Sequence, residues 1–322
     1  MPIAFDKAVI GSPITWIAAT YSLTPSGLEV RIKESLVDET VALMQQILGG
    51  NYVLEKVLRT CIGKAMYIAS LITVVRPFLS ELYAALQSPS SSKHGLPVIW
   101  TKQIAHSLTW LLILLTESRT ELVRRFDLCA YLGQGTRVEI CLDASPWGLG
   151  GFLVISGRIT AWFACVISTA EKELLHIVEG DCAAQQTVEA LAVLVALRAW
   201  KNQWIHKRVM LKIKSDSISA LVIAFKLKTK GSGSGTIARE VALDIACSEY
   251  QPHIVEHIPG VDNVIADELS RRYQPGHEFV LPAILKDVPE TVFTARGREY
   301  FKTADTPSLV RRFAVKRGGG SS

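Results

Sequence analysis

The chain has 322 residues, of which 49% are hydrophobic and 20% are charged. This composition is typical of a globular protein with room for two or three domains, and it excludes a largely disordered chain. The formal net charge of +5 permits nucleic-acid binding but does not require it. The longest apolar runs, such as residues 190 to 197, are far shorter than the roughly 20 residues that cross a bilayer. We therefore expect no membrane partner.

The cysteines and the amino terminus bear on the cellular compartment. No two cysteines form a C-x-x-C pair, and their wide scatter favours reduced thiols over a disulfide framework or a zinc site. Asp6 and Lys7 interrupt the first residues before an apolar core of signal-peptide length develops. An intracellular protein, cytoplasmic or nuclear, is the expectation. The six cysteines are Cys61, Cys129, Cys141, Cys165, Cys182 and Cys247.

Residues 1 to 95 read as a small sheet edge followed by helices. Two short apolar runs on either side of a Pro-Ser-Gly turn at residues 25 to 27 predict a hairpin. Apolar positions at helical spacing predict a helix over residues 35 to 48, which Gly49-Gly50 ends. Residues 53 to 59 and 64 to 87 predict further helices, with a break at Arg76-Pro77.

A Ser, Pro and Gly-rich stretch over residues 88 to 97 indicates an exposed linker and a domain boundary near residue 95. We expect residues 96 to 135 to form a connection segment. Within it, the spacing of the leucines at 108, 111, 112 and 115 predicts a helix with one apolar face.

The stretch from residue 138 to 167 predicts three strands. Val138, Ile140 and Leu142 alternate with polar residues, and two tight turns lead into two further apolar runs, so the three strands form an antiparallel meander. Asp143 lies at the end of the first strand.

Three more carboxylates fall at defined positions in the elements that follow. Glu189 lies on a predicted helix over residues 181 to 200, and Asp216 follows a predicted strand over residues 209 to 214. After two helices and a fifth strand, Asn263 is a predicted cap of a last helix, with Asp267 in its first turn. The elements predict an α/β domain over residues 136 to 273, with a mixed five-stranded sheet and flanking helices. Residues 274 to 322 predict an irregular, mobile tail.

This second half resembles the ribonuclease H domain of reverse transcriptases, in particular those of gypsy-class retrotransposons. The opening strand of that domain is matched by Asp143-Ala144-Ser145 and Gly148-Leu149-Gly150. Its closing motif is matched by Pro259-Gly260, Asn263 and Ala266-Asp267-Glu268-Leu269-Ser270-Arg271. The resemblance implies a ribonuclease H-like fold and a metal-dependent endonuclease that hydrolyses the RNA strand of RNA/DNA hybrids.

Residues 10 to 130 resemble the same family more loosely. Trp16-Ile17-Ala18 through Gly27-Leu28 is similar to a primer-grip hairpin, and Arg76-Pro77-Phe78-Leu79 is similar to part of the thumb and connection helices. The alternative for these residues is an ordinary helical bundle. No Tyr-x-Asp-Asp turn occurs, so polymerase activity is not expected from this chain. The polymerase half of a reverse transcriptase is a possible partner, beside an RNA/DNA hybrid.

The resemblance assigns roles to the four acids, Asp143, Glu189, Asp216 and Asp267. It implies that Asp143 bridges two Mg²⁺ ions, that Glu189 and Asp216 complete one ion site, and that Asp267 completes the other, with Mn²⁺ as an alternative metal. Two such ions serve the attacking and the leaving oxygen of a phosphodiester. The resemblance also places Glu189 to sense the 2′-hydroxyl that distinguishes RNA from DNA.

Other interpretations stay open at this level. The domain can instead be a catalytically degenerate relative that binds nucleic acid or supports a polymerase, or another member of the superfold. His257 precedes the last turn and is a candidate for assisting product release. Lys226, Lys228 and Lys230 can follow a phosphate backbone or form a solvated helix end. The run of Gly and Ser at residues 231 to 235 predicts a flexible loop.

Overall fold

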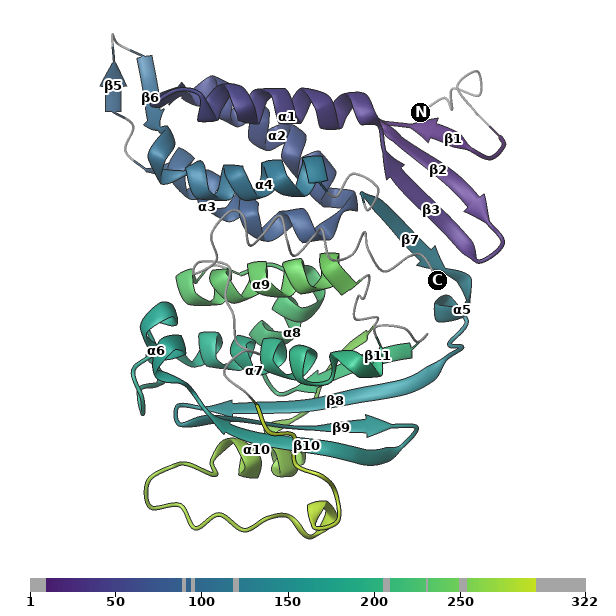
Figure 1. The fold of residues 1–322 in the computed structure, drawn as a ribbon, viewed down its shortest axis with the longest axis vertical. Coiled ribbons are helices and arrows are strands. Elements are labelled where there is room, and N and C mark those ends of the chain that lie inside the picture. The colour runs from purple at the N-terminus through teal and green to yellow at the C-terminus, as the bar shows by residue number, and fades with distance from the viewer. Residues whose placement is uncertain are drawn as a thin grey trace, which may run out of the picture. The chain divides into compact units, whose positions relative to one another are not determined.

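The computed structural model describes residues 10–88, 91–93, 96–117, 122–204, 209–229, 231–248 and 254–293. Two compact units, Met1–Gln134 and Gly135–Ser322, make up the chain. Each has its own helices and strands (Figure 1) and its own buried apolar side chains.

The first unit combines a four-stranded antiparallel sheet with helices. The sheet has the order β1-β2-β3-β7, and the strands are β1 (Ile14–Trp16), β2 (Ala19–Thr24), β3 (Gly27–Ile32) and β7 (Val123–Asp127). The helices are α1 (Glu34–Leu48), α2 (Glu55–Leu71), α3 (Arg76–Gln87), α4 (Ala105–Glu117) and the short α5 (Leu128–Tyr131), with 3-10 turns η2 (Thr73–Val75) and η3 (Thr101–Gln103). A smaller sheet joins β4 (Tyr52–Leu54), β6 (Leu96–Trp100) and β5 (Ser91–Lys93).

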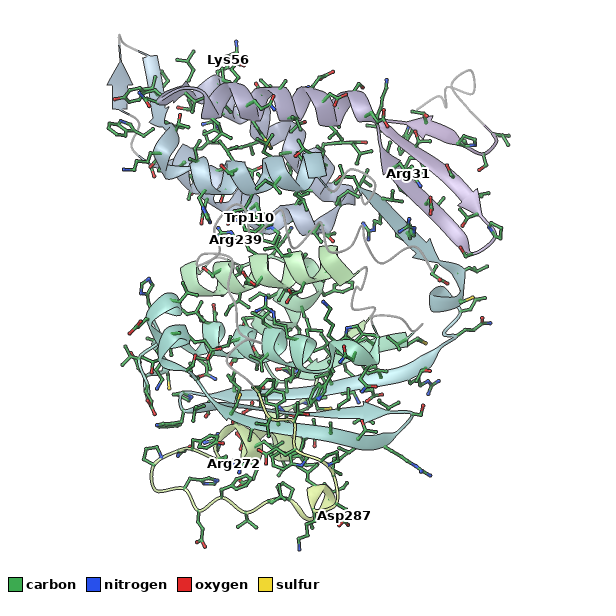
Figure 2. All side chains as sticks on the ribbon, viewed as in Figure 1. Arg31, Lys56, Trp110, Arg239, Arg272 and Asp287 are labelled. Carbon is green, nitrogen blue, oxygen red and sulfur yellow. The ribbon has the colours of Figure 1, made fainter. Side chains whose placement is uncertain are left out.

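Helices α1 to α4 form the core of the first unit. Trp110 of α4, labelled in Figure 2, is buried and stacks on Phe78 of α3 with ring centroids 5.9 Å apart. Residues 96 to 135 were expected as a separate connection segment. They contribute β6, α4 and β7 to this first unit, so their pairing partners lie among residues 1 to 95.

The second unit contains the predicted mixed five-stranded sheet, with the order β10-β9-β8-β11-β12. The meander β8-β9-β10 is antiparallel, while β11 runs parallel to both β8 and β12. The strands are β8 (Thr136–Ser145), β9 (Gly148–Ile155), β10 (Arg158–Val166), β11 (Val209–Ser215) and β12 (Ile254–His257). The helices are α6 (Thr169–Leu175), α7 (Gln185–Ala199), α8 (Ile218–Lys226), α9 (Ser232–Ser248) and α10 (Val264–Ser270), with 3-10 turns η5 (Cys182–Ala184), η6 (Lys201–Gln203), η7 (Gly260–Asp262) and η8 (Ala283–Leu285).

Helices cover both faces of this sheet. Figure 1 shows α7, α8 and α9 on one side and α10 on the other. The segment Cys182–Ala199 is long and apolar enough to cross a membrane by length and composition. Its helix α7 packs on β8 and β9 with one side and on α8 and α9 with another, so it is apolar nearly all round because it is the core helix of this unit.

Gly and Ser at residues 231 to 235 do not form the predicted loop, because α9 begins at Ser232. A Cβ on Gly233 would lie 2.9 Å from the carbonyl oxygen of Leu175 and 2.8 Å from the Thr187 side chain. The lack of a side chain at Gly233 lets α9 lie close to Leu175 and Thr187. Gly233 therefore serves close packing and not the flexibility that the sequence predicted.

Residues 274–293, which we call the strap, lie along the α10 side of the sheet. The Trp162 indole donates a hydrogen bond to the Val288 carbonyl (2.9 Å), and Thr291 N–H donates to the Trp162 carbonyl (2.7 Å). Leu285 is fully buried in a cluster with Trp162 and Leu269. The expectation of a mobile tail is therefore wrong for residues 274–293, since proline-rich irregular chain can still bury apolar side chains. Residues 294–322 lie outside the described part of the chain.

Candidate active site at the carboxyl ends of the central strands

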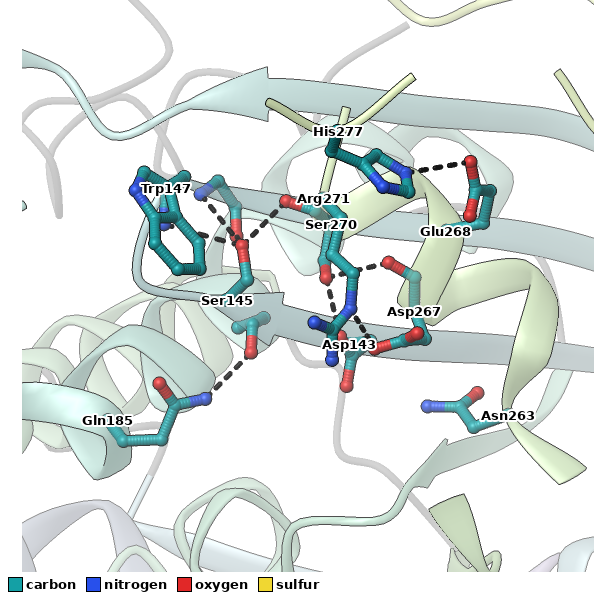
Figure 3. Close-up of polar contacts among 12 residues, drawn as sticks. Asp143, Ser145, Trp147, Gln185, Asn263, Asp267, Glu268, Ser270, Arg271 and His277 are labelled. Carbon is teal, nitrogen blue, oxygen red and sulfur yellow. Dashed lines mark hydrogen bonds and ion pairs between the residues drawn. The ribbon is translucent and has the colours of Figure 1, made fainter. Parts of the chain in front are cut away.

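Asp143 lies on the face of β8 that α10 covers. Its partner in β9 is Gly150, and a Cβ on Gly150 would lie only 2.4 Å from the Ser270 backbone nitrogen. The missing side chain lets α10 lie directly on the sheet. As a result the Ser270 hydroxyl reaches Asp143 and donates a hydrogen bond to Oδ2 at 2.6 Å (Figure 3).

Asp216 follows the last residue of β11. The parallel register pairs Cys141 with Lys214, so two residues further along the strands Asp216 comes level with Asp143. A Cβ on Gly260 would lie 3.3 Å from Asp216 Oδ2, so the turn after β12 is close to this carboxylate. His257 Nε2 lies 3.0 Å from the Asp216 carbonyl oxygen, which ties the end of β12 to the end of β11.

Asp267 is on α10, one turn before Arg271. Arg271 Nε donates to Asp267 Oδ1 at 2.7 Å, and both side chains are about two-fifths exposed, at 43% and 42%. The same bond holds the pKa of Arg271 above its usual value, and the charge of Asp143 adds to this effect. Figure 3 shows Arg271 directed toward Asp143 and Asp267.

Glu189 is held by hydroxyl and amide donors. The Ser217 hydroxyl donates to Glu189 Oε2, and the Ser219 hydroxyl donates to the same oxygen at 3.2 Å. Gln185, one turn earlier on α7, donates through Nε2 to the Ala144 carbonyl at 2.7 Å and lies 3.3 Å from Glu189 Oε1. Glu189 is thus tied both to the end of β8 and to the start of α8, which directly follows Asp216.

The carboxylates influence one another electrostatically. The pKa of Asp143 is raised to about 7, mainly by burial and also by the charges of Asp216 and Asp267, while the Ser270 hydrogen bond acts to lower it. Asp143 therefore lies within Coulombic range of two other carboxylates in a poorly hydrated place. Such a cluster holds protons near neutral pH unless a cation takes their place.

The structure places Asp143, Asp216 and Asp267 close enough to interact electrostatically. Glu189 is connected to this edge by hydrogen bonds, through Ser217 and Gln185. Carboxylate oxygens are the ligands that Mg²⁺ takes, so the donor set fits this metal in kind. Among the described residues, however, no group of three His, Cys, Asp or Glu side chains is arranged to hold one ion. The side chains instead bond Ser270, Arg271, and Ser217 and Ser219 at the start of α8.

Several residues of this site were not found by sequence reasoning. Ser270 and Arg271 are part of the closing motif, but nothing in their spacing assigns them to Asp143 and Asp267. Gln185 lies four residues before Glu189, which places both on one helix face and was the available signal. Asn263 is the N-cap residue of α10, as predicted, but its side chain makes no cap hydrogen bond and donates instead to the Leu142 carbonyl at 2.9 Å.

Comparison with known proteins gives distant likenesses only. No family model matches this chain, and no curated protein matches it. Similar solved structures include the foamy viral protease-reverse transcriptase in three complexes, namely a dRH form with double-stranded DNA, a second complex with double-stranded DNA, and one with an RNA/DNA hybrid. Sequence identities to these are 13%, 13% and 15%, and TM-scores are 0.29, 0.29 and 0.28.

The matches cover 78%, 79% and 87% of this chain but only 38%, 46% and 31% of the viral chains, so this chain spans less than half of the proteins it is similar to.

Proposed function

We propose that the second unit is a ribonuclease H-like domain that hydrolyses the RNA strand of RNA/DNA hybrids with divalent metal ions. The observation that carries the proposal is the parallel register of β8 and β11, which brings Asp216 level with the buried Asp143 at one edge of the sheet, with Asp267 of α10 in Coulombic range. The strand order, with Asp143 on the central β8 and Asp216 after the adjacent β11, supports it. The closing motif around Asp267 supports it too.

Within this proposal each acid has a role taken from the family resemblance. Asp143 would be a ligand of both Mg²⁺ ions, Glu189 and Asp216 would be ligands of one, and Asp267 of the other. When bound, the ions supply an activated water and neutralise the leaving oxygen. Asp143 has to lose its proton before it can bind a metal ion, so at limiting Mg²⁺ activity should rise with pH through about 7, and more Mg²⁺ should move this midpoint to lower pH. Gln185, Ser217 and Ser219 orient the Glu189 carboxylate.

A second candidate is a catalytically degenerate domain that only binds nucleic acid or supports a polymerase. Its supporting observation is the pairing of Asp267 with Arg271, together with the lack of a three-ligand cluster in the described residues. The two candidates differ in one measurable respect, because only the first requires the acids for hybrid cleavage.

The deciding experiment uses the full chain and a hybrid labelled on the RNA strand, with Mg²⁺ and, separately, Mn²⁺. We expect cleavage of RNA in the hybrid, none of duplex DNA, and a loss of at least about a thousandfold in the Asp143→Asn variant. Glu268→Gln is the matched control, since Glu268 is next to Asp267 but bonds the strap through His277 at 3.0 Å. A wild-type chain that binds the hybrid and leaves it intact with both metals would favour the degenerate domain.

A further inference from the structure

Helix α10 directs three polar side chains to the acidic edge from one of its faces. Ser270 and Arg271 follow Asp267 by three and four residues, so all three lie on the same side of the helix. The Ser270 hydroxyl reaches Asp143 and lies 2.6 Å from its Oδ2. Arg271 is the next residue, and its guanidinium lies beside the same two carboxylates (Figure 3).

Arg271 is bonded to Asp267 twice. Its Nε donates to Asp267 Oδ1 at 2.7 Å, and its backbone N–H donates to the Asp267 carbonyl at 3.1 Å. The side-chain bond is the main cause that raises the pKa of Arg271, and the charges of Asp143 and Glu268 add to it. A fixed positive charge therefore holds an oxygen of Asp267 that the proposed function assigns to a metal ion.

The next arginine in the sequence has a different partner. Arg272, labelled in Figure 2, donates through Nη1 to Glu290 Oε1 of the strap at 2.6 Å. Its guanidinium carbon lies 5.3 Å from the ring centroid of Phe279, which is also in the strap. Arg272 thus serves the attachment of the strap, whereas Arg271 serves the acids.

The pair of Asp267 and Arg271 is exposed enough to open. The Arg271 and Asp267 side chains are 43% and 42% exposed, and an exposed i,i+4 ion pair contributes little to stability. The Arg198 side chain, by contrast, is 15% exposed and bonds the fully buried Glu240. An arginine that is needed for the fold is buried with its partners, so the exposed Arg271 is suited to exchange with another cation.

We propose that Arg271 is a tethered cation that competes with divalent metal ions for Asp267 and Asp143. This inference rests on the proposed function, because it concerns the regulation of the same site. Metal binding by Asp267 needs the oxygen that Arg271 holds, and two cations at one place repel each other. The arginine contact and the metal therefore exclude each other, and each weakens the other by the same factor. The arginine sets the metal concentration that the site requires.

The test measures metal binding to the full-length protein without nucleic acid, so cleavage plays no part. Mg²⁺ is titrated calorimetrically into the wild type, Arg271→Gln and Arg271→Lys, while NMR follows the arginine Nε–H signals of the wild type. Asp143→Asn identifies the part of the heat that belongs to the acidic edge. Arg272→Gln is the control, with the same charge change one residue further along. Circular dichroism establishes that the variants are folded.

We expect Arg271→Gln to bind Mg²⁺ at least about fivefold more tightly than the wild type, which is the usual size of coupling between two ligands. Arg271→Lys keeps the positive charge and should stay near the wild type, and Arg272→Gln should have a clearly smaller effect than Arg271→Gln. In the wild type, Mg²⁺ should move the Arg271 Nε–H signal toward that of a solvent-exposed arginine and leave the Arg272 signal in place.

Equal or weaker Mg²⁺ binding by Arg271→Gln would overturn the inference, because the arginine would then only orient Asp267. Equal effects of Arg271→Gln and Arg272→Gln would overturn it too. The proposed function survives both results as long as Asp143→Asn still removes Mg²⁺ binding. If Mg²⁺ binding never depends on Asp143, the inference and the metal-dependent function both fail.

Discussion

Two charged clusters in the second unit combine their charges in opposite ways. At the acidic edge, Asp143 lies in the field of Asp216 and Asp267. Burial is the larger cause of its raised pKa, and the like charges add to it. This arrangement is unfavourable alone and becomes favourable with a ligand of opposite charge.

The other cluster shows what the chain does when charge serves the fold. Arg198 of α7 donates to Asp244 Oδ2 at 2.5 Å and to the buried Glu240, both on α9. Burial by itself would lower the pKa of Arg198, but Asp244 and Glu240 together raise it. Opposite charges therefore meet where two core helices pack, and like charges meet at the acidic edge, where we propose metal ions. The comparison predicts opposite effects on stability for the two kinds of cluster.

The largest stability effect is expected for Arg198→Met, which leaves the acids on α9 without this guanidinium. Removing one partner of a buried ion pair costs about 3 to 5 kcal/mol of unfolding free energy. Urea denaturation measures it. Arg59→Met is the matched control, because Arg59 forms an exposed i,i+4 pair with Glu55 and should cost at most about 0.5 kcal/mol. Equal effects of the two substitutions would contradict the structural role of the mixed cluster.

The strap comes next, since the acidic edge depends on α10 remaining on the sheet. Leu285 is fully buried against Trp162 and Leu269, so Leu285→Ala should cost about 2 to 3 kcal/mol. Hydrogen exchange should then accelerate in α10 and β10 more than in α7. Ile284→Ala is the control, because Ile284 is 61% exposed and its truncation should leave exchange unchanged. If Leu285→Ala left both the unfolding free energy and the exchange rates unchanged, the strap would not hold α10 on the sheet.

Sequence pattern was informative where one physical requirement dominates. Alternating apolar residues identified β8 and β11, because a strand with buried side chains permits few other readings, and a carboxylate at each strand end followed directly. The pattern failed where a residue type serves several purposes. Gly233 was predicted to lie in a flexible loop and is a close-packing residue, and Asn263 is the predicted N-cap but its side chain bonds the Leu142 carbonyl.

Features that depend on tertiary contact had no signal in the sequence. The apolar residues of the strap show neither helical nor strand spacing, because its irregular backbone buries single side chains at uneven intervals. Arg124 and Arg125 are identical in sequence terms, and only the register with β3 assigns them to different faces. The partner of Asp143 is Ser270, which is 127 residues away. No local pattern contains such a pair.

The like-charge cluster gives the opposite sign of effect. The pKa of Asp143 rises from 3.8 to about 7 on folding, so the folded chain binds this proton more tightly than the unfolded chain. Folding stability from this group is present at low pH and is lost as pH rises through about 7. Asp143→Asn lacks this loss, so the metal-free variant should be more stable than the wild type at pH 8 by about 4 kcal/mol, with little difference between the two at pH 4. Urea denaturation at the two pH values measures the unfolding free energy. A variant less stable than the wild type at pH 8 would show that the charged Asp143 is not unfavourable in the folded protein.

The smallest effect expected is that of Ser270→Ala, and it tests the coupling within the site. The Ser270 hydroxyl donates to Asp143 and holds the pKa of that carboxyl lower than burial alone would. Without the hydroxyl, the pKa should rise by roughly half a unit to one unit, in keeping with the net worth of about 1 kcal/mol for one hydrogen bond. The carboxyl ¹³C shift of Asp143 in metal-free protein reports this titration directly. Ser219→Ala is the control, because Ser219 bonds Glu189 and not Asp143, so it should leave the Asp143 midpoint in place. If Ser270→Ala instead lowered that midpoint, the hydroxyl would be accepting a hydrogen bond from protonated Asp143 rather than donating one. The Asp143 carboxyl would then be neutral in the folded chain, and the negative charge of the acidic edge would come from Asp216 and Asp267 alone.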